Sequence, residues 1–261
     1  VVQVGQQQRS GEVWNSAMQH IHSGGIGEIK KVNVWANFPY GMGSSKVPNQ
    51  SVPEGLDYAL WQGPAEKRAY NPNHVHGSWR HFWDYGGGLM TDWGVHLLDM
   101  ALWAKKISHE PKTVLASAAN YNMDTYYRET YEMMDVSYPM EDYMIHWSHT
   151  AGIQTGPYDK AYGVEFVGEK GVLLADRGDW SIRLGDKGES EKATLLAKEK
   201  FDFKGNSDME IHVLNFLDCV RSRGVTNCPI ETGRNVALYA HMGNIAARSG
   251  TQYLIWNEAT G

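Results

Sequence analysis

Three ionisable side chains, Asp92, His96 and Asp99, follow one another at intervals of four and three residues in a strongly apolar stretch of the chain. In a helix this spacing places all three on one stripe, because residues at i, i+4 and i+7 share a face. Burying such a stripe costs free energy unless its groups are hydrogen-bonded or ion-paired. A buried stripe of this kind therefore has a structural or a catalytic role. An imidazole beside a carboxylate has a shifted pKa and a fixed tautomer, so it can transfer a proton near neutral pH.

Two interpretations of this stripe are open from the residues alone. In the first, Asp92 and His96 satisfy each other or brace neighbouring loops. In the second, His96 is a general acid or base and Asp92 orients it. Three glycines at 86–88 directly precede the stripe and favour the second interpretation, since glycine lets the backbone approach a ligand closely.

The elements that must position this stripe are predicted from periodicity and turn residues. Ser10 is expected to cap the first helix, and Ser207 with Glu210 fits a capping box before an apolar stripe that includes Val213 and Leu217. We expect a first helix at 10–23 and further helices at 92–104 and 232–248. We expect strands at 28–38, 113–121, 130–140, 142–149, 163–167 and 171–176. Strands grouped between helices predict an α+β fold, with one open, mainly antiparallel β-sheet and helices on one face.

A long irregular segment connects the first strand to the stripe. From Gly41 to about His74 the chain is rich in Gly, Pro, Asn and Ser. Long ordered loops are usually functional. The chain also holds 10 Trp and 14 Tyr, whose rings offer the flat apolar faces and polar tips that a sugar ring needs.

Bulk properties exclude some classes of function. A net charge of -6 provides no basic surface for nucleic acid or an anionic membrane. No apolar run approaches the ~20 residues of a membrane helix. The compartment is not determined by the sequence: it is cytoplasmic or, if an export signal precedes this segment, periplasmic.

The stretch from 61 to 103 resembles the glucose–fructose oxidoreductase and inositol dehydrogenase (Gfo/Idh/MocA) family. Members carry a Gly-rich turn, then an Asp and a His four apart on a helix, then a further Asp and often a Trp. The matching segments here are Trp61-Gln62-Gly63-Pro64, Tyr70-Asn71-Pro72, Trp79 to Tyr85, the glycines at 86–88, and Asp92, His96, Asp99 and Trp103. Weaker resemblance continues through Asn215 to Cys219 and Gly243 to Ala246.

The resemblance implies that residues 1–261 form the substrate-binding, catalytic C-terminal domain of a nicotinamide-dependent oxidoreductase acting on a hydroxyl of a sugar, cyclitol or glycoside. A Rossmann domain holding NAD or NADP would precede it, and residues 1–9 would end a strand that joins the two. No cofactor is expected to bind this chain alone, because it has no Gly-x-Gly-x-x-Gly after a strand. His96 would transfer the proton, and Asp92 would orient it or contact the substrate.

The resemblance also implies which side chains surround the reacting groups. Gln8 and Arg9 would approach the nicotinamide or the substrate. A homo-oligomer would form through the open face of the sheet, which we expect to carry Tyr and Met side chains. The sugar would contact Trp79, Arg80, Tyr85 and His76.

Three other functions fit parts of the same sequence. One is a non-catalytic sugar-binding or oligomerisation module. Another is a glycoside lyase or hydrolase that uses NAD without net redox change. A zinc or manganese site would draw on His74, His76, His81 and His96, but their spacing matches no strong metal signature, so we expect no metal.

Overall fold

The computed structural model describes residues 1–121, 123–184, 195–200, 207–257 and 259. Nine strands form one sheet in the order β10-β9-β8-β7-β1-β6-β5-β3-β11. Only β1 and β6 pair in parallel among these strands, and the other neighbours are antiparallel. The predicted α+β fold with an open, mainly antiparallel sheet is therefore confirmed.

The strands of this sheet are short, from three to eight residues. Their bounds are β1 Ile29–Ala36, β3 Thr113–Ala119, β5 Met133–Pro139, β6 Met144–Thr150, β7 Tyr162–Gly168, β8 Gly171–Ala175, β9 Asp179–Leu184, β10 Leu195–Lys200 and β11 Tyr253–Ile255. A separate pair joins β2 (Ser44–Ser45) to β4 (Tyr126–Tyr127). A tight turn between Gly168 and Gly171 joins β7 to β8.

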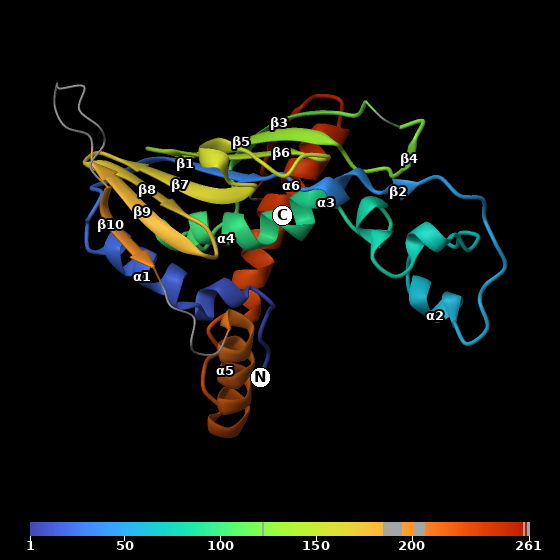
Figure 1. The fold of residues 1–261 in the computed structure, drawn as a ribbon, viewed down its shortest axis with the longest axis horizontal. Coiled ribbons are helices and arrows are strands. Elements are labelled where there is room, and N and C mark those ends of the chain that lie inside the picture. The colour runs from blue at the N-terminus through green and yellow to red at the C-terminus, as the bar shows by residue number, and fades with distance from the viewer. Residues whose placement is uncertain (122, 185–194, 201–206, 258, 260–261) are drawn as a thin grey trace.

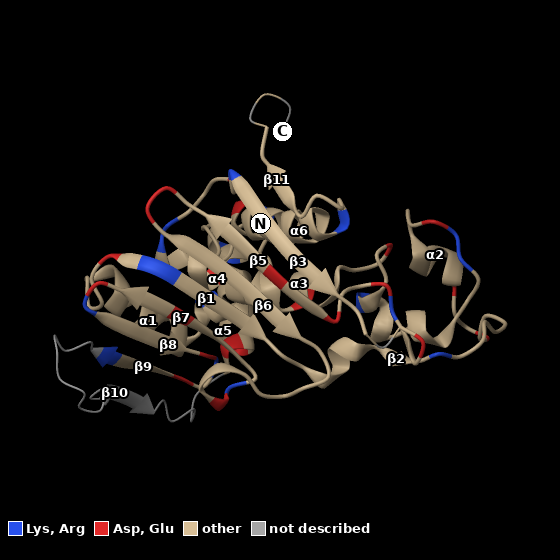
Figure 2. Ribbon diagram, turned by 90° about the horizontal axis from the view of Figure 1, so that it is seen from above, with Lys and Arg blue, Asp and Glu red and all other residues tan. Residues whose placement is uncertain are grey.

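The longer helices lie on one face of the sheet, as predicted (Figure 1). They are α1 (Glu12–His22), α4 (Gly94–Ala104), α5 (Asp208–Ser222) and α6 (Ile230–Arg248). Viewed from above, the opposite face of the sheet has no helical cover (Figure 2). Among the described residues, no helix has the length and apolar character needed to cross a bilayer.

Helix α4 runs through the centre of the core, between the sheet and its neighbours α1 and α6. Leu97, Leu98, Met100 and Ala101 are all fully buried. A helix covered on every side must be apolar on nearly every side, which explains its composition. Its few polar groups are therefore held in fixed positions by the packing around them.

The predicted helix over 92–104 is wrong in its first turn. The helical segment starts earlier, with α3 (Gly88–Asp92), and is interrupted at Trp93 before α4 begins. Trp93 keeps right-handed helical torsions (φ -86°, ψ -29°), so the break is local. Asp92 and His96 consequently stay on the same side of the segment.

The prediction that residues 1–9 end a strand joining a preceding domain stays a prediction. In this structure Val4 donates its N–H to the carbonyl of Cys228, and the chain then turns into the 3₁₀ helix η1 (Gln7–Ser10). One expectation near the N-terminus is wrong: helix α1 is capped by Gly11 rather than Ser10. The Ser10 hydroxyl instead lies 2.7 Å from Nδ1 of His212, so a tertiary contact replaces the local cap.

Helix α5 has the predicted capping box of Ser207 and Glu210. Its predicted apolar stripe, however, is not buried by the described part of the chain. Val213 and Leu217 are 47% and 41% exposed. Contiguous exposed apolar side chains usually mark a surface that another domain or protein covers.

The long irregular segment predicted from Gly41 to about His74 continues to the glycines at 86–88, and this whole excursion extends away from the sheet (Figure 1). It contains α2 (Tyr58–Gln62) and the 3₁₀ helices η2 (Pro39–Met42), η3 (Pro72–His74) and η4 (Ser78–His81). Asn71 ties it together, since its side chain accepts from Asn73 N–H and donates to the carbonyl of Val47.

The open face of the sheet is more polar than expected. Met133 and Met144 lie on it, but Tyr138 points to the helices and donates to the carbonyl of Tyr239. The prediction of a face rich in Tyr and Met is therefore wrong. Polar side chains alternate outward along β1, β5 and β6 instead: Asn33, Asp135, Ser137, His146 and Ser148. Assembly through this face stays a prediction.

Candidate active site

A pocket of about 520 Å³ opens where helix α4 begins, beside His96. Five separate parts of the chain build it, which only the folded sheet and excursion bring together. Its lining residues are Gln7, Tyr40, Gly43, Ser44, Gly77, Ser78, Arg80, His81, Asp92, Trp93, His96 and Arg177. Three residues that the sequence singled out, Arg80, Asp92 and His96, thus share one cavity.

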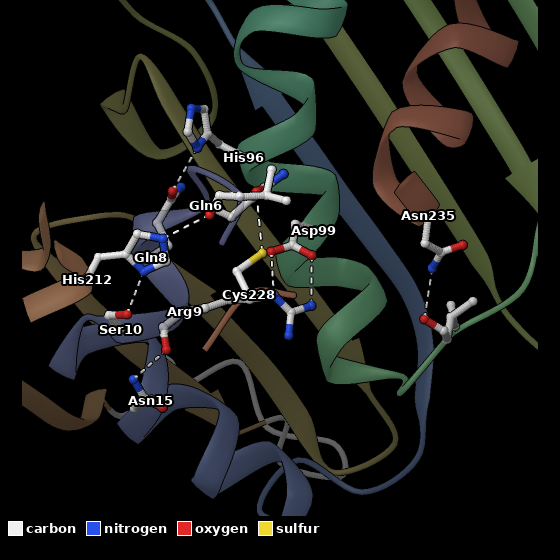
Figure 3. Close-up of polar contacts among 12 residues, drawn as sticks. Gln6, Gln8, Arg9, Ser10, Asn15, His96, Asp99, His212, Cys228 and Asn235 are labelled. Carbon is white, nitrogen blue, oxygen red and sulfur yellow. Dashed lines mark hydrogen bonds and ion pairs between the residues drawn. The ribbon is translucent and has the colours of Figure 1, made fainter. Parts of the chain in front are cut away.

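His96 is held by Gln8, a fully buried residue of η1. Its Nδ1 lies 3.0 Å from Oε1 of Gln8 (Figure 3). Because an amide oxygen only accepts, the neutral ring carries its proton on Nδ1, and Nε2 is left as the basic nitrogen. Burial, together with the positive charge of Arg177, lowers the pKa of His96 to about 4. The ring is therefore neutral near pH 7 and ready to accept a proton.

Asp92 does not bind His96 directly, since the two share no hydrogen bond in the described chain. Its Oδ2 accepts from the hydroxyl of Tyr40 at 2.7 Å, and its Oδ1 lies 3.2 Å from Nε of Arg80. Partial burial and the charge of Asp92 raise the pKa of Tyr40, which therefore stays a donor. Asp92 is thus a fixed carboxylate at the pocket wall, and Gln8 is the residue that orients His96.

Asp99, the third residue of the predicted stripe, lies outside the pocket. Its two oxygens each lie 2.7 Å from a guanidinium nitrogen of Arg9, one from Nε and one from Nη2 (Figure 3). The Arg9 guanidinium also packs over the ring of Trp103 at 5.0 Å. This buried pair fastens η1 to α4, so it sets where Gln8 sits relative to His96.

Arg177 is a pocket residue that sequence analysis missed. It follows β8, and its guanidinium lies over the Trp93 ring at 4.4 Å. Its Nε is buried and has no hydrogen-bond partner among the described residues. Burial lowers the pKa of Arg177, although nearby Tyr162 and Asp208 favour its charge. No motif surrounds it in the sequence, so only the pairing of β7, β8 and β1 reveals that it faces His96.

Tyr40 and Gln7 were also missed, although both had a usable signal. Tyr40 stands directly after the first strand, where the irregular excursion starts, and loops at strand ends often carry function. Gln7 adjoins Gln8 and Arg9, which the resemblance had already marked. The structure therefore adds Gln7 beside the predicted residues Gln8 and Arg9, and it adds the loop after β1 that carries Tyr40.

Three predicted substrate contacts lie elsewhere. Trp79 and Tyr85 line a second cavity of about 430 Å³, together with Trp61, Gln62, Pro64, Ala65 and Asp84. His76 is exposed and lines neither of these two cavities. The predicted single sugar pocket is therefore divided, with Arg80 on the His96 side and the aromatic residues on the other.

The histidines considered as metal ligands do not form a cluster. Within the described ranges, no group of three or more His, Cys, Asp and Glu side chains is placed to hold a metal ion. Nδ1 of His74 lies 3.0 Å from the hydroxyl of Tyr58, and its ring meets that of Phe82 edge-on. His81 lines the pocket, and burial lowers its pKa to about 4.

Comparison with solved structures shows the same fold in several dehydrogenases. The aldose–aldose oxidoreductase from Caulobacter crescentus, solved with glycerol, matches 98% of this chain and 64% of its own, with a TM-score of 0.64 and 12% identity. The WlbA dehydrogenase from Bordetella pertussis, solved with NADH and UDP-GlcNAcA, matches 98% and 63%, with a TM-score of 0.60 and 14% identity.

The UDP-N-acetylglucosamine 3-dehydrogenase GnnA from Acidithiobacillus ferrooxidans matches 95% of this chain and 63% of its own, with a TM-score of 0.59 and 14% identity. This chain therefore spans less than two thirds of the length of each of these three proteins. No curated protein sequence matches the chain. At such low identity the solved structures establish the fold alone.

A family model described as the oxidoreductase family, C-terminal alpha/beta domain (GFO_IDH_MocA_C2), matches residues 23–145. That span includes β1, the whole excursion, α3, α4 and the first strands after them, and so it holds His96, Asp92 and Arg80. The resemblance noted in the sequence is thereby confirmed. Residues 23–145 match the C-terminal alpha/beta domain of the Gfo/Idh/MocA oxidoreductase family.

Proposed function

We propose that this chain is the substrate-binding and catalytic part of an NAD(P)-dependent oxidoreductase that acts on a hydroxyl group of a sugar, cyclitol or glycoside. The observation that supports this most is the state of His96. Its ring is neutral, its Nδ1 is engaged by Gln8, and its Nε2 makes no hydrogen bond to the described residues. A base prepared in this way, in a pocket of about 520 Å³, suits removal of a proton from a small hydroxylated molecule.

In the proposed reaction, Nε2 of His96 accepts the proton of the substrate hydroxyl as the carbon that bears it is oxidised to a carbonyl. The bound nicotinamide supplies the other half of the chemistry by taking the hydride from that carbon. Gln8 stabilises the protonated ring, because its oxygen accepts a stronger hydrogen bond from the charged imidazolium. In the reverse direction His96 returns the proton to the carbonyl oxygen.

Asp92 and Arg80 are proposed to hold the substrate rather than to transfer its proton. A carboxylate has about four lone-pair directions, and Tyr40 and Arg80 occupy only part of them. Asp92 can therefore accept from a second substrate hydroxyl beside the reacting one. The unpartnered Nε of Arg177 offers a donor on the other side of His96. In this proposal Asp92 and Arg80 orient the substrate, and His96 transfers its proton.

Gln7 lines the pocket beside His96 and is half-buried. Its side-chain amide would bind the carboxamide of a nicotinamide group. Arg9, by contrast, is fully engaged by Asp99, so we propose that it positions η1 instead of contacting the cofactor.

The exposed apolar side chains of α5, including Val213 and Leu217, support a two-part enzyme. In the complete protein we propose that a dinucleotide-binding domain covers this face and brings NAD or NADP to His96. The chain alone is expected to bind neither. Calorimetry that gives a micromolar Kd for NAD(P) with this chain alone would contradict the two-part proposal.

The proposed activity is tested by supplying the complete protein with NAD or NADP and a panel of sugars, cyclitols and glycosides, and following the absorbance of the reduced nicotinamide. We expect net reduction with at least one hydroxylated ring. Carbonyl formation should match nicotinamide reduction one to one. Turnover of a glycoside with no net nicotinamide reduction would point to a lyase or hydrolase, and binding without any reaction would point to a binding module.

A further inference from the structure

The second cavity, of about 430 Å³, lies within the excursion and shares no lining residue with the His96 pocket. Helix α2 contributes Trp61 and Gln62, and η4 contributes Trp79. Asp84 and Tyr85 complete the aromatic and polar part of its wall. We call this cavity the aromatic subsite.

Three aromatic rings line the aromatic subsite, and contacts with neighbouring side chains hold them in place. Trp61 stacks on Tyr58 with centroids 5.5 Å apart and planes 12° apart, and it meets Tyr85 at 4.7 Å. Trp79 carries the guanidinium of Arg80 at 4.6 Å. Rigid aromatic faces lose little conformational entropy when a ligand packs on them, so they suit a flat ligand with an apolar C–H face.

Polar groups with unused hydrogen-bonding capacity surround these rings. Nε2 of Gln62 donates to the carbonyl of Arg68, but Oε1 of Gln62 accepts no hydrogen bond within the described residues. Oδ2 of Asp84 pairs with Arg68 at 2.6 Å, which leaves Oδ1 free to accept. The indole N–H groups of Trp61 and Trp79 likewise donate to no described residue.

This combination suits a hydroxylated ring. Arg68 pairs with Asp84 and also with Glu129, so the carboxylate of Asp84 is ion-paired and its remaining oxygen is an acceptor for the subsite. Free oxygens and indole N–H groups can bind several hydroxyls, while the ring faces pack on C–H groups. A pyranose has both features: hydroxyls around its edge and an apolar C–H face.

Arg80 links the aromatic subsite to the His96 pocket. Its guanidinium packs on the Trp79 ring, and its Nε lies 3.2 Å from Oδ1 of Asp92. The two cavities are therefore separated by little more than this one residue pair. A ligand with two linked rings can place one ring on each side of Arg80.

We propose that the aromatic subsite binds a second sugar ring of the substrate, so that the enzyme acts on a disaccharide or longer glycoside with its reacting ring at His96. This proposal rests on the proposed function, because it assigns the reacting ring to the His96 pocket. Arg80 then contacts the reacting ring, while Trp61 and Trp79 contact the distal one.

The test uses this chain and four probe sugars: glucose, cellobiose, maltose and lactose. Affinities are measured by calorimetry and by saturation-transfer NMR. One aromatic contact contributes about 0.5–1.5 kcal/mol, which corresponds to roughly 2- to 12-fold in affinity. We expect at least one disaccharide to bind more tightly than glucose by about that factor, and its addition should shift the indole N–H signals of Trp61 and Trp79.

Trp61→Ala should remove the advantage of the disaccharide over glucose, whereas Trp61→Phe should keep part of it. Trp83→Ala is the matched control, because Trp83 is also half-buried but packs on Tyr131 and Arg248. Equal affinities for glucose and every disaccharide, no shift at either indole, or equal effects of Trp61→Ala and Trp83→Ala would each overturn the proposal.

The two proposals fail in different experiments. A disaccharide advantage that depends on Trp61, in a complete protein that oxidises no sugar, would contradict the proposed function and leave the aromatic subsite standing. If the complete protein oxidises a sugar at a rate that Trp61→Ala does not change, and no disaccharide binds more tightly than glucose, the proposed function stands and the aromatic subsite is contradicted.

Discussion

The contact between Gln8 and His96 determines which ring nitrogen of His96 carries the proton. The sequence was sufficient to select His96, because an ionisable residue on an apolar helix needs a reason to be there. It was not sufficient to find its partner. Gln8 is distant along the chain and has no charge, and the resemblance marked it only as approaching the nicotinamide or the substrate, so local spacing pointed to Asp92 instead. Only tertiary packing of η1 on α4 shows that Gln8 binds the ring.

Replacing Gln8 tests this contact. Gln8→Leu removes the acceptor for Nδ1 and leaves the size of the side chain similar. Hydrogen bonds to charged groups contribute about 1.5–3 kcal/mol, so kcat in the complete enzyme should fall roughly 10- to 100-fold. The melting temperature should fall only modestly, because Gln8→Leu leaves Nδ1 of His96 without its acceptor but also removes the unpartnered buried Nε2 of Gln8. Steady-state kinetics with an unchanged kcat would show that Gln8 does not orient His96.

At the scale of elements, η1 is a single 3₁₀ turn that depends on contacts with two helices. Arg9 binds Asp99 on α4, and Ser10 binds His212 on α5 (Figure 3). These tertiary contacts explain one wrong expectation and one feature of the stripe. Ser10 does not cap α1 because its hydroxyl contacts His212, and Asp99 lies outside the pocket because it is paired with Arg9.

The strands and helices themselves were largely predictable. Alternating burial in β5 and β6 and the capping box of Ser207 follow from local sequence, and these elements appear where expected. The interruption at Trp93 and the edge strand β11 do not, because β11 has only three residues. The strand β9 was missed although its Trp180 and Ile182 alternate inward. Arg177 could not be found because its position depends on the strand order.

Breaking the Arg9–Asp99 pair should destabilise the protein strongly. Asp99→Asn leaves the buried guanidinium of Arg9 without a counter-charge, which typically costs about 3–5 kcal/mol. The double variant Arg9→Met/Asp99→Leu removes both charges and should recover part of that loss. Urea unfolding of the single and double variants measures the difference. A single variant as stable as the wild type would contradict the role of this pair in holding η1.

At the scale of the whole molecule, the fold keeps several histidines neutral. Burial lowers the pKa of His81, His96 and His149 to about 4 in each case. In the unfolded chain these groups titrate near 6.5. Between pH 6.5 and pH 4 the unfolded chain therefore binds more protons than the folded one, and protonation favours unfolding.

The stabilisation from these neutral histidines should consequently be complete above pH 6.5. The free energy of unfolding should fall as the pH is lowered toward 4. Urea unfolding at pH 7, 5.5 and 4.5 measures the slope. His149→Gln, at a buried site away from the pocket, should make the slope shallower. Stability that rises as the pH falls from 6.5 to 4.5 would show that these histidines are protonated in the folded protein.

The most direct test of the proposed function is His96→Ala in the complete enzyme, with turnover and melting temperature measured on the same preparation. General acid–base catalysis contributes roughly 10²–10⁴-fold, so kcat should fall by about that factor while folding and dinucleotide affinity stay near those of the wild type. His146→Ala, on the open face of the sheet, is the matched control and should keep its turnover. A His96→Ala protein whose folded fraction turns over at the normal rate would contradict the account and leave His96 as a structural residue only.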